Sequence, residues 1–151
     1  MNEMDKVEKE ILIQAPIEKV WRALTDYVEF GKWFQVKLDQ PFETGKDSTG
    51  HMTIPGYEHV KWEAKVLEMK ENKLFSFAGP PYVENADVDL SKEPWLTTIF
   101  TLTTTAEGTL VKVVESGFSK LSPSIRSKAR TGNTDGWDFQ MKNLFDYVSQ
   151  L

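Results

Sequence analysis

The chain has 151 residues, the size of one ordinary domain, and a domain of this length buries about two-thirds of the surface of its unfolded chain. Its net charge of -5 and isoelectric point near 5.1 argue against a nucleic-acid partner, because phosphate binding needs a clustered excess of lysine and arginine. The lack of cysteine excludes a disulfide framework, a thiolate nucleophile and a zinc site of the cysteine type. We therefore expect a single domain over residues 1–151.

The N-terminal segment MNEMDKVEKE is charged from its third residue and leads into only a short apolar run. This pattern fits neither a signal peptide nor a membrane span. It predicts a cytoplasmic protein with no membrane partner.

The following segments predict one strand and then two short helices. Ile11 and Ile13 share one face of the strand, and Pro16 presets the backbone dihedral for the first turn of a helix. One apolar stripe with helical spacing consists of Ile17, Val20, Trp21 and Leu24. A second helix is expected over DYVEFGKWF, where Asp26 can serve as the N-cap and Gly31 leaves the end of the helix open.

From about Val36 to Phe118 the sequence predicts six further strands, separated by turn sequences such as TGKDSTG, KENK and AEG. Successive side chains of a strand face opposite sides, so the charged positions of VKWEAKV turn Trp62 and its alternate neighbours toward the core. The same parity rule places further side chains inside, namely Phe75, Phe77, Thr98, Phe100 and Leu102. The inner surface of the sheet is therefore expected to be aromatic.

The segment TLVKVVESGF places a carboxylate on this inner surface. If Lys112 faces water, parity puts Val111, Val113 and Glu115 inside. A buried carboxylate must be paired, hydrogen-bonded or protonated, because leaving it charged and dry costs several kcal/mol. Glu115 is therefore either a polar anchor in an apolar cavity, or a β-bulge near Gly117 shifts the parity and turns it to solvent.

The last residues, NTDGWDFQMKNLFDYVSQL, predict one amphipathic helix that Asn133 or Thr134 could cap. Its apolar stripe consists of Trp137, Met141, Leu144, Phe145, Val148 and Leu151. After a run of antiparallel strands, such a helix is expected to cross the concave face of a curled sheet. Any one of these aromatic residues fits a filled core, but together they predict a pocket between helix and sheet.

The string APIEKVWRALTDYVEFGKWF resembles the N-terminal signature of the START-like, or SRPBCC, superfamily in its AHSA-type branch. The segment GTLVKVVESGF is similar to the penultimate element of that branch, and DGWDFQMKNLFDYV is similar to its final helix. The resemblance spans essentially the whole chain, with three segments in the right order.

This resemblance implies an α+β helix-grip fold. In that fold a curved antiparallel sheet of about seven strands wraps around a long C-terminal helix, and two short helices follow the first strand. The resemblance also implies that the space between sheet and helix can hold a hydrophobic ligand. The chaperone activators that give the branch its name join this domain to a separate partner-binding domain, which a chain of this length is expected to lack.

Candidate catalytic and metal-binding groups are few. His51 and His59 both fall at outward-facing positions, where a catalytic role is not favoured. The acidic residues of ENADVDLSKE lack the glycine and terminal glutamate of a calcium loop, so we expect no metal. If the protein catalyses a reaction, Glu115 is the best general-base candidate.

Two polar segments leave alternatives open. The stretch from Gly79 to Pro94 is longer than most hairpin connections and predicts either a lid over the cavity or a surface Ω-loop packed by Tyr82 and Val83. The basic residues of IRSKARTGN could attract an acidic head group or could form ordinary solvated surface; they are Arg126, Lys128 and Arg130.

Three functions remain as hypotheses. The favoured one is non-catalytic binding of a small hydrophobic or aromatic molecule, lipid-like or polyketide-like, by a monomer or weak dimer without a cofactor. The others are a cyclase or hydrolase that uses Glu115 in the same cavity, and a stress-related module that binds a chaperone or another protein. The expected ligand-binding residues are Trp33, Phe34, Met52, Trp62, Phe75, Phe77, Phe100, Val113, Glu115, Trp137, Met141 and Phe145.

Overall fold

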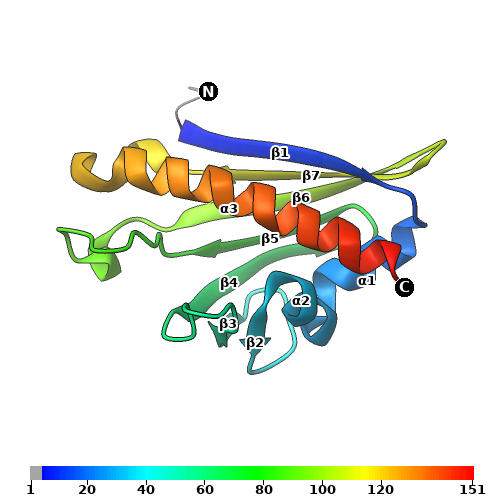
Figure 1. Cartoon of the computed structure of the whole chain (residues 1–151), viewed down its shortest axis with the longest axis horizontal. Helices are drawn as coiled ribbons and strands as arrows, with labels where there is room; N and C mark the ends of the chain where they lie inside the picture. Colours follow the sequence, from blue (N-terminus) through cyan, green and yellow to red (C-terminus); the bar gives the residue numbers. More distant parts are fainter. Residues whose placement is uncertain (1–4) are drawn as a thin grey trace.

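A computed structural model describes residues 5–151, which form a curved antiparallel sheet and a long helix on its concave side (Figure 1). The elements in chain order are β1 (Lys6–Ile13), α1 (Ile17–Thr25), α2 (Tyr27–Phe34), β2 (Val36–Leu38), β3 (Asp47–Met52), β4 (Lys61–Lys70), β5 (Leu74–Gly79), η2 (Leu90–Lys92), β6 (Leu96–Thr105), β7 (Gly108–Ser116), η3 (Phe118–Lys120) and α3 (Pro123–Ser149). None of the helices in this described part combines the length and apolarity that a membrane-spanning helix needs.

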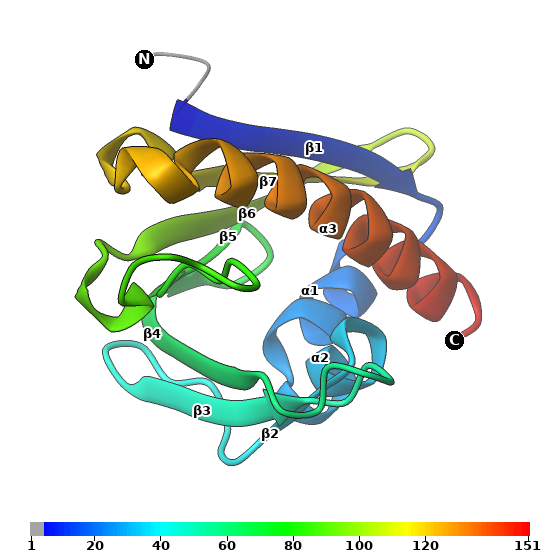
Figure 2. The same ribbon diagram turned by 60° about the vertical axis from the view of Figure 1, so that its left-hand side comes forward.

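The sheet has seven strands in the order β1-β7-β6-β5-β4-β3-β2, and each neighbouring pair is antiparallel. The first strand therefore pairs with the last, and α1 and α2 connect the two edge strands. Figure 2 shows the sheet curling around these two helices while α3 runs along β1 and closes the open side. This arrangement confirms the α+β helix-grip fold and the six strands expected after the second helix.

The two short helices begin and end for local reasons. The Asp26 carboxylate accepts hydrogen bonds from the backbone N–H groups of Val28 and Glu29 at 3.0 Å, which confirms it as the N-cap of α2. The helix continues through Gly31 to Phe34. A Cβ atom at Gly31 would lie 2.5 Å from the carbonyl oxygen of Val36, so only glycine allows β2 to approach α2 this closely.

The inner face of the sheet follows the parity expected from the sequence. Lys61, Glu63 and Lys65 of β4 are exposed, and the alternate residues Ala64 and Val66 are buried. Buried on the neighbouring strands are Phe75, Phe77, Thr98, Phe100 and Leu102. Burial of a phenylalanine side chain contributes about 1.5–3 kcal/mol, so this aromatic layer supplies much of the stability of the domain.

The C-terminal helix starts earlier than the sequence indicated. It begins at Pro123 and not near Asn133 or Thr134, so neither of these residues is its cap. Ser122 precedes it, and both its backbone N–H and its hydroxyl donate to the Glu93 carboxylate at 2.7 Å. The additional turns bury Ile125 and Ala129, which compensates for the low helix propensity of glycine at two interior positions.

The apolar stripe of α3 is narrower than expected. Trp137, Met141, Leu144 and Val148 are buried, but Phe145 is 37% exposed. Phe145 follows Trp137 by eight residues, which places it about 80° around the helix at 3.6 residues per turn. Leu151 lies beyond the end of the helix and is 52% exposed. The predicted apolar stripe was therefore wrong at Phe145 and at Leu151.

Candidate ligand-binding site

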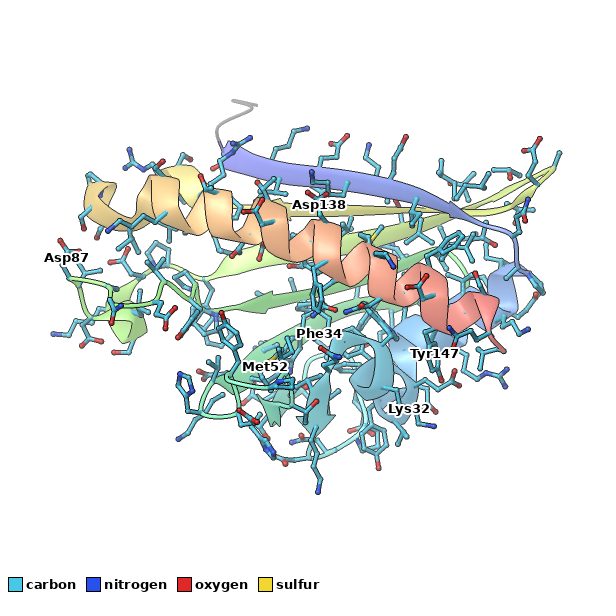
Figure 3. All side chains as sticks on the ribbon, viewed as in Figure 1. Lys32, Phe34, Met52, Asp87, Asp138 and Tyr147 are labelled. Carbon is cyan, nitrogen blue, oxygen red and sulfur yellow. The ribbon has the colours of Figure 1, made fainter. Side chains whose placement is uncertain are left out.

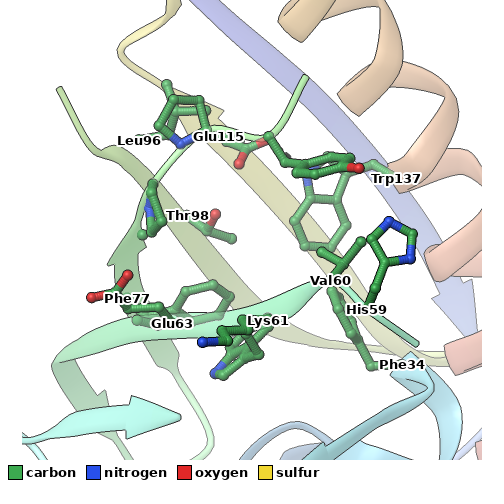
Figure 4. Close-up of a pocket in the computed structure, with 16 residues that line it drawn as sticks. Phe34, His59, Val60, Lys61, Glu63, Phe77, Leu96, Thr98, Glu115 and Trp137 are labelled. Carbon is green, nitrogen blue, oxygen red and sulfur yellow. Dashed lines mark hydrogen bonds between the residues drawn. The ribbon is translucent and has the colours of Figure 1, made fainter. Parts of the chain in front are cut away.

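A cavity of about 310 Å³ lies between the concave face of the sheet and α3 (Figure 4). Strands β4 to β7 supply its floor, the end of α2 and the middle of α3 supply rings, and the segment 80–82 borders its mouth. The volume falls at the lower end of the range of small-molecule sites, which is about 300–1,000 Å³. The cavity is therefore large enough for a compact organic molecule.

Glu115 of β7 is the buried acidic residue of this cavity and is 9% exposed. Its Oε1 atom accepts hydrogen bonds from Nδ2 of Asn133 at 2.8 Å and from Nε1 of Trp137 at 2.9 Å. The ladder between β6 and β7 stays regular from Gly108 to Ser116, with Thr98 opposite Glu115. The bulge alternative was therefore wrong, because the parity does not shift before Gly117.

The electrostatic environment of Glu115 is neutral. Burial raises the pKa of the carboxyl above its ordinary value, and hydrogen bonds from Trp137, Asn133 and Thr98 oppose this effect. Among the described residues, no lysine or arginine forms an ion pair with Glu115. The carboxyl is thus held by dipoles alone and has no positive charge beside it.

Aromatic rings form much of the cavity wall. Phe34 lies 5.4 Å from Trp62 and 6.2 Å from Trp137 between ring centroids, and Trp62 lies 5.4 Å from Phe77. Hydrogen bonds fix two of these residues: Nε1 of Trp62 donates to Oγ of Ser48 at 2.9 Å, and Trp137 donates to Glu115. These anchored rings keep the wall rigid.

A second recess, of about 250 Å³, shares Phe34 and Trp137 with the main cavity. Glu115 lines both spaces, and Met52, Gly136 and Phe139 line the recess alone. Figure 3 shows Phe34 beneath α3 with Met52 of β3 on the same side. Two rings and one carboxylate are therefore common to two neighbouring hollows.

The mouth of the main cavity lies between β4 and the segment that follows β5. His59, Lys61, Glu63 and Tyr82 border it, and Figure 4 labels His59 and Phe34 among the residues that line the cavity. The imidazole is exposed as expected, but it lies at the cavity rim and not on a remote face.

The stretch from Gly79 to Pro94 is attached to the body of the domain along its length. Val83 is buried, Asp87 accepts a hydrogen bond from the Ser124 hydroxyl at 2.8 Å, and Glu93 binds Ser122. Figure 3 shows Asp87 below the first turns of α3. These contacts are typical of a packed Ω-loop, and only its first residues reach the cavity.

The structure divides the twelve expected ligand-binding residues into four groups. Five of them line the main cavity, namely Phe34, Trp62, Phe77, Glu115 and Trp137. Met52 lines the recess, and Phe145 borders neither space. The others are buried in the core around the site, namely Trp33, Phe75, Phe100, Val113 and Met141. Their contact with a ligand stays a prediction.

Three polar or small residues of the site were not recognised from the sequence as site residues. Asn133 was interpreted as a helix cap, although its spacing of four residues from Trp137 places both on one helix face. Thr98 was assigned to the inner face but not to the site. No sequence pattern indicated Gly136, because its position in the site depends on where α3 crosses the recess.

The remaining polar candidates lie away from both spaces. His51 is exposed on β3, and no cluster of potential metal ligands occurs among residues 5–151. Arg126 donates to the carbonyl oxygen of Leu121 at 3.0 Å, and Arg130 donates to that of Lys6 at 3.2 Å. These arginines and Lys128 border neither the cavity nor the recess.

A curved sheet that grips a C-terminal helix over a lined cavity defines the START-like class of domain. The sequence profile described as Activator of Hsp90 ATPase homolog 1-like protein matches residues 14–149, and the chain belongs to this family. None of the curated proteins matches the chain at a significant level.

Solved structures of bacterial proteins share this fold. A Mesorhizobium loti protein is 25% identical, with a TM-score of 0.77 over 96% of this chain and 97% of its own. A Nitrosomonas europaea protein is 18% identical, with a TM-score of 0.75 over 99% and 97% of the two chains. DynU16, from the dynemicin biosynthetic locus, is 21% identical with a TM-score of 0.70, and the match covers 95% of this chain but 47% of DynU16.

Proposed function

We propose that the protein binds a small hydrophobic or aromatic molecule, without catalysis, in the cavity between the sheet and α3. The observation that carries this proposal is the cavity of about 310 Å³ with ring walls and one buried carboxylate. Ligand sites typically combine apolar walls with a few polar groups that fix orientation. Domains of this superfamily commonly hold ligands in the same place.

Two features favour binding over the other hypotheses. An interaction module would have a filled interior, whereas this interior is hollow beside Trp137. A hydrolase or cyclase commonly needs a second acid or base near Glu115, and the three groups that hold this carboxyl are an amide, an indole and a hydroxyl.

An enzyme remains the second candidate because of one observation. Burial raises the pKa of Glu115, and catalytic acids and bases frequently show such shifts. This candidate requires a turnover that Glu115→Gln abolishes while the protein stays folded. Retention of that turnover in the variant would exclude Glu115 as the acid or base.

A tryptophan-fluorescence titration tests the binding proposal. The purified protein is titrated with fatty acids, sterols, flavonoids and aromatic polyketides. We expect saturable quenching by at least one class, reduced in Trp137→Phe and kept in Trp95→Phe, since Trp137 lines both hollows, Trp62 still reports on the main cavity, and Trp95 lines neither space. Circular dichroism verifies that both variants fold. No saturable response from any class would contradict the proposal.

A further inference from the structure

Within residues 5–151, the carboxylate of Glu115 has hydrogen-bond donors but no counter-ion. Its hydrogen-bond partners are the neutral side chains of Asn133 and Trp137, and the uncharged Thr98 lies opposite it on β6. A buried carboxylate without a positive partner is costly to ionise, and an opposite charge nearby relieves that cost. A ligand that brings a positive charge would supply what the protein itself does not.

The rings beside Glu115 suit the same charge. Phe34 and Trp137 border both hollows together with the carboxylate, and Trp62 and Phe77 continue the wall of the main cavity. The face of an aromatic ring carries partial negative charge and attracts a cation, most strongly where water is excluded. A carboxylate with several adjacent rings is the arrangement that binds organic ammonium groups.

The other charges at the cavity do not oppose this preference. The charged lining residues are Glu63 and Lys61 at the mouth and Glu115 inside. Two carboxylates and one ammonium give a lining charge of -1, and the chain as a whole carries -5. An anionic ligand such as a fatty acid would bring its charge toward Glu115, which like-charge repulsion disfavours.

We propose that the ligand is an organic cation, an aromatic or hydrophobic molecule with one ammonium group that contacts both the Glu115 carboxylate and the adjacent rings of Phe34 and Trp137 from the open space of the cavity. This inference rests on the proposed function and specifies its ligand class. The apolar remainder of the molecule occupies the space along Trp62 and Phe77. Glu115 lines both hollows, so ligands of different lengths can share the same anchor.

A pair of isosteric probes tests the charge directly. Benzyltrimethylammonium and neopentylbenzene have the same shape, because a quaternary nitrogen in the first is a quaternary carbon in the second. Both are titrated into the protein, and binding is followed by tryptophan fluorescence. We expect the cation to bind at least about tenfold more tightly, as a desolvated cation–π contact beside a carboxylate requires.

Two matched variants locate the origin of the preference. Glu115→Gln keeps the volume of the side chain and its acceptor oxygen but removes the charge, so we expect most of the preference to be lost, with only the contribution of the rings left. Glu63→Gln removes an exposed carboxylate of the mouth and is expected to keep most of the preference. Equal binding of the probes to the unmodified protein, no binding of the cation, or a preference that persists undiminished in Glu115→Gln would each overturn the inference.

The outcome separates this inference from the proposed function. If neutral flavonoids or polyketides bind in a Trp137-dependent manner and the cation shows no advantage, the cavity is a ligand site and only the ligand class is wrong. If no probe and no member of the wider panel binds, both proposals fail.

Discussion

One part of the aromatic layer is tightly packed, and another part of the same layer leaves a hollow. Near α2, the ring centroids of Phe30 and Phe42 are 5.2 Å apart, those of Phe42 and Phe75 are 5.0 Å apart, and Phe30 and Phe75 are fully buried. Near β7, the rings of Phe77 and Trp137 border a hollow instead. The hollow part differs by its polar groups, since a carboxyl that needs hydrogen-bond donors cannot be covered by rings alone.

This comparison teaches that aromatic content does not by itself make a cavity. Carbon-only side chains interdigitate to the density of an organic crystal, and the Phe30 region does so. Glu115, Thr98 and Asn133 add polar groups that orient toward one another across the layer. The space around them remains open, and that is where a ligand fits.

The largest expected effect comes from truncating a ring in the filled part. Phe75→Ala should lower the free energy of unfolding by about 3–5 kcal/mol, because it creates a new void. Phe77→Ala should cost less, about 1–3 kcal/mol, since that ring already borders empty space and its removal enlarges an existing hollow instead of creating a new one. Urea denaturation measures both values. Equal losses would show that the two parts are packed alike.

The charge of Glu115 should make stability depend on pH. Because the pKa of this carboxyl is raised in the folded protein, the folded state binds more protons than the unfolded state from the ordinary value of 4.5 up to the raised pKa. Stability from this group is present below pH 4.5 and is lost as the pH rises through that window.

Glu115→Gln should remove this loss, so the variant should gain stability relative to the unmodified protein as the pH increases. Urea denaturation between pH 4 and pH 8 measures the difference, and Glu63→Gln serves as the exposed control. A difference that stays constant over the range would mean that Glu115 titrates at its ordinary pKa.

Binding of the cationic probe should strengthen as the pH rises. An ammonium ligand favours the ionised form of Glu115, so its affinity increases until the carboxyl is fully deprotonated. The groups that face Glu115 from α3 and β6 are neutral, and the charged or titratable groups at the mouth are His59, Lys61 and Glu63.

Titrations of benzyltrimethylammonium at several pH values measure this dependence. The His59→Gln variant serves as the control for the imidazole. In this variant the affinity should still increase with pH, whereas in Glu115→Gln it should be nearly independent of pH. If the pH dependence of affinity disappears in His59→Gln, it comes from the mouth of the cavity and not from Glu115.

The smallest effect is expected at the two glycines of α3. A Cβ atom at Gly132 or Gly136 would meet no other atom within 4 Å, so alanine at either position should raise the free energy of unfolding by up to about 1 kcal/mol. Gly136 lines the recess and Gly132 does not. Only Gly136→Leu should weaken binding of ligands long enough to enter the recess, and Gly132→Leu is the matched control.

Much of the fold followed from local patterns. The parity of charged residues placed Glu115 inside, and the capping pattern located the start of α2 at Asp26. The start of α3 was not predictable in the same way, because it depends on a hydrogen bond from Ser122 to Glu93, which is 29 positions away in the chain. The exposed position of Phe145 depends on which face of α3 the sheet covers.

The sequence predicted the type of the candidate site, a ring-lined cavity with one carboxylate, but not its full extent. Its anchor and most of its ring walls came from strand and helix periodicity. The division into two hollows did not, because it results from how the ring of Phe34 packs beside Trp137. The hydrogen bond from Gln140 to the carbonyl oxygen of Phe34, at 2.8 Å, joins α3 to α2 there, and no local pattern indicates such a contact.

The most direct test of ligand binding in the cavity is the nuclear magnetic resonance spectrum of the indole N–H groups. The chain has five tryptophans, so the protein labelled with nitrogen-15 gives five resolvable signals. On addition of a ligand identified by fluorescence, we expect the signals of Trp137 and Trp62 to shift saturably and those of Trp21 and Trp95 to stay in place. Shifts confined to Trp95, or the absence of shifts at saturating ligand, would contradict a binding site between the sheet and α3.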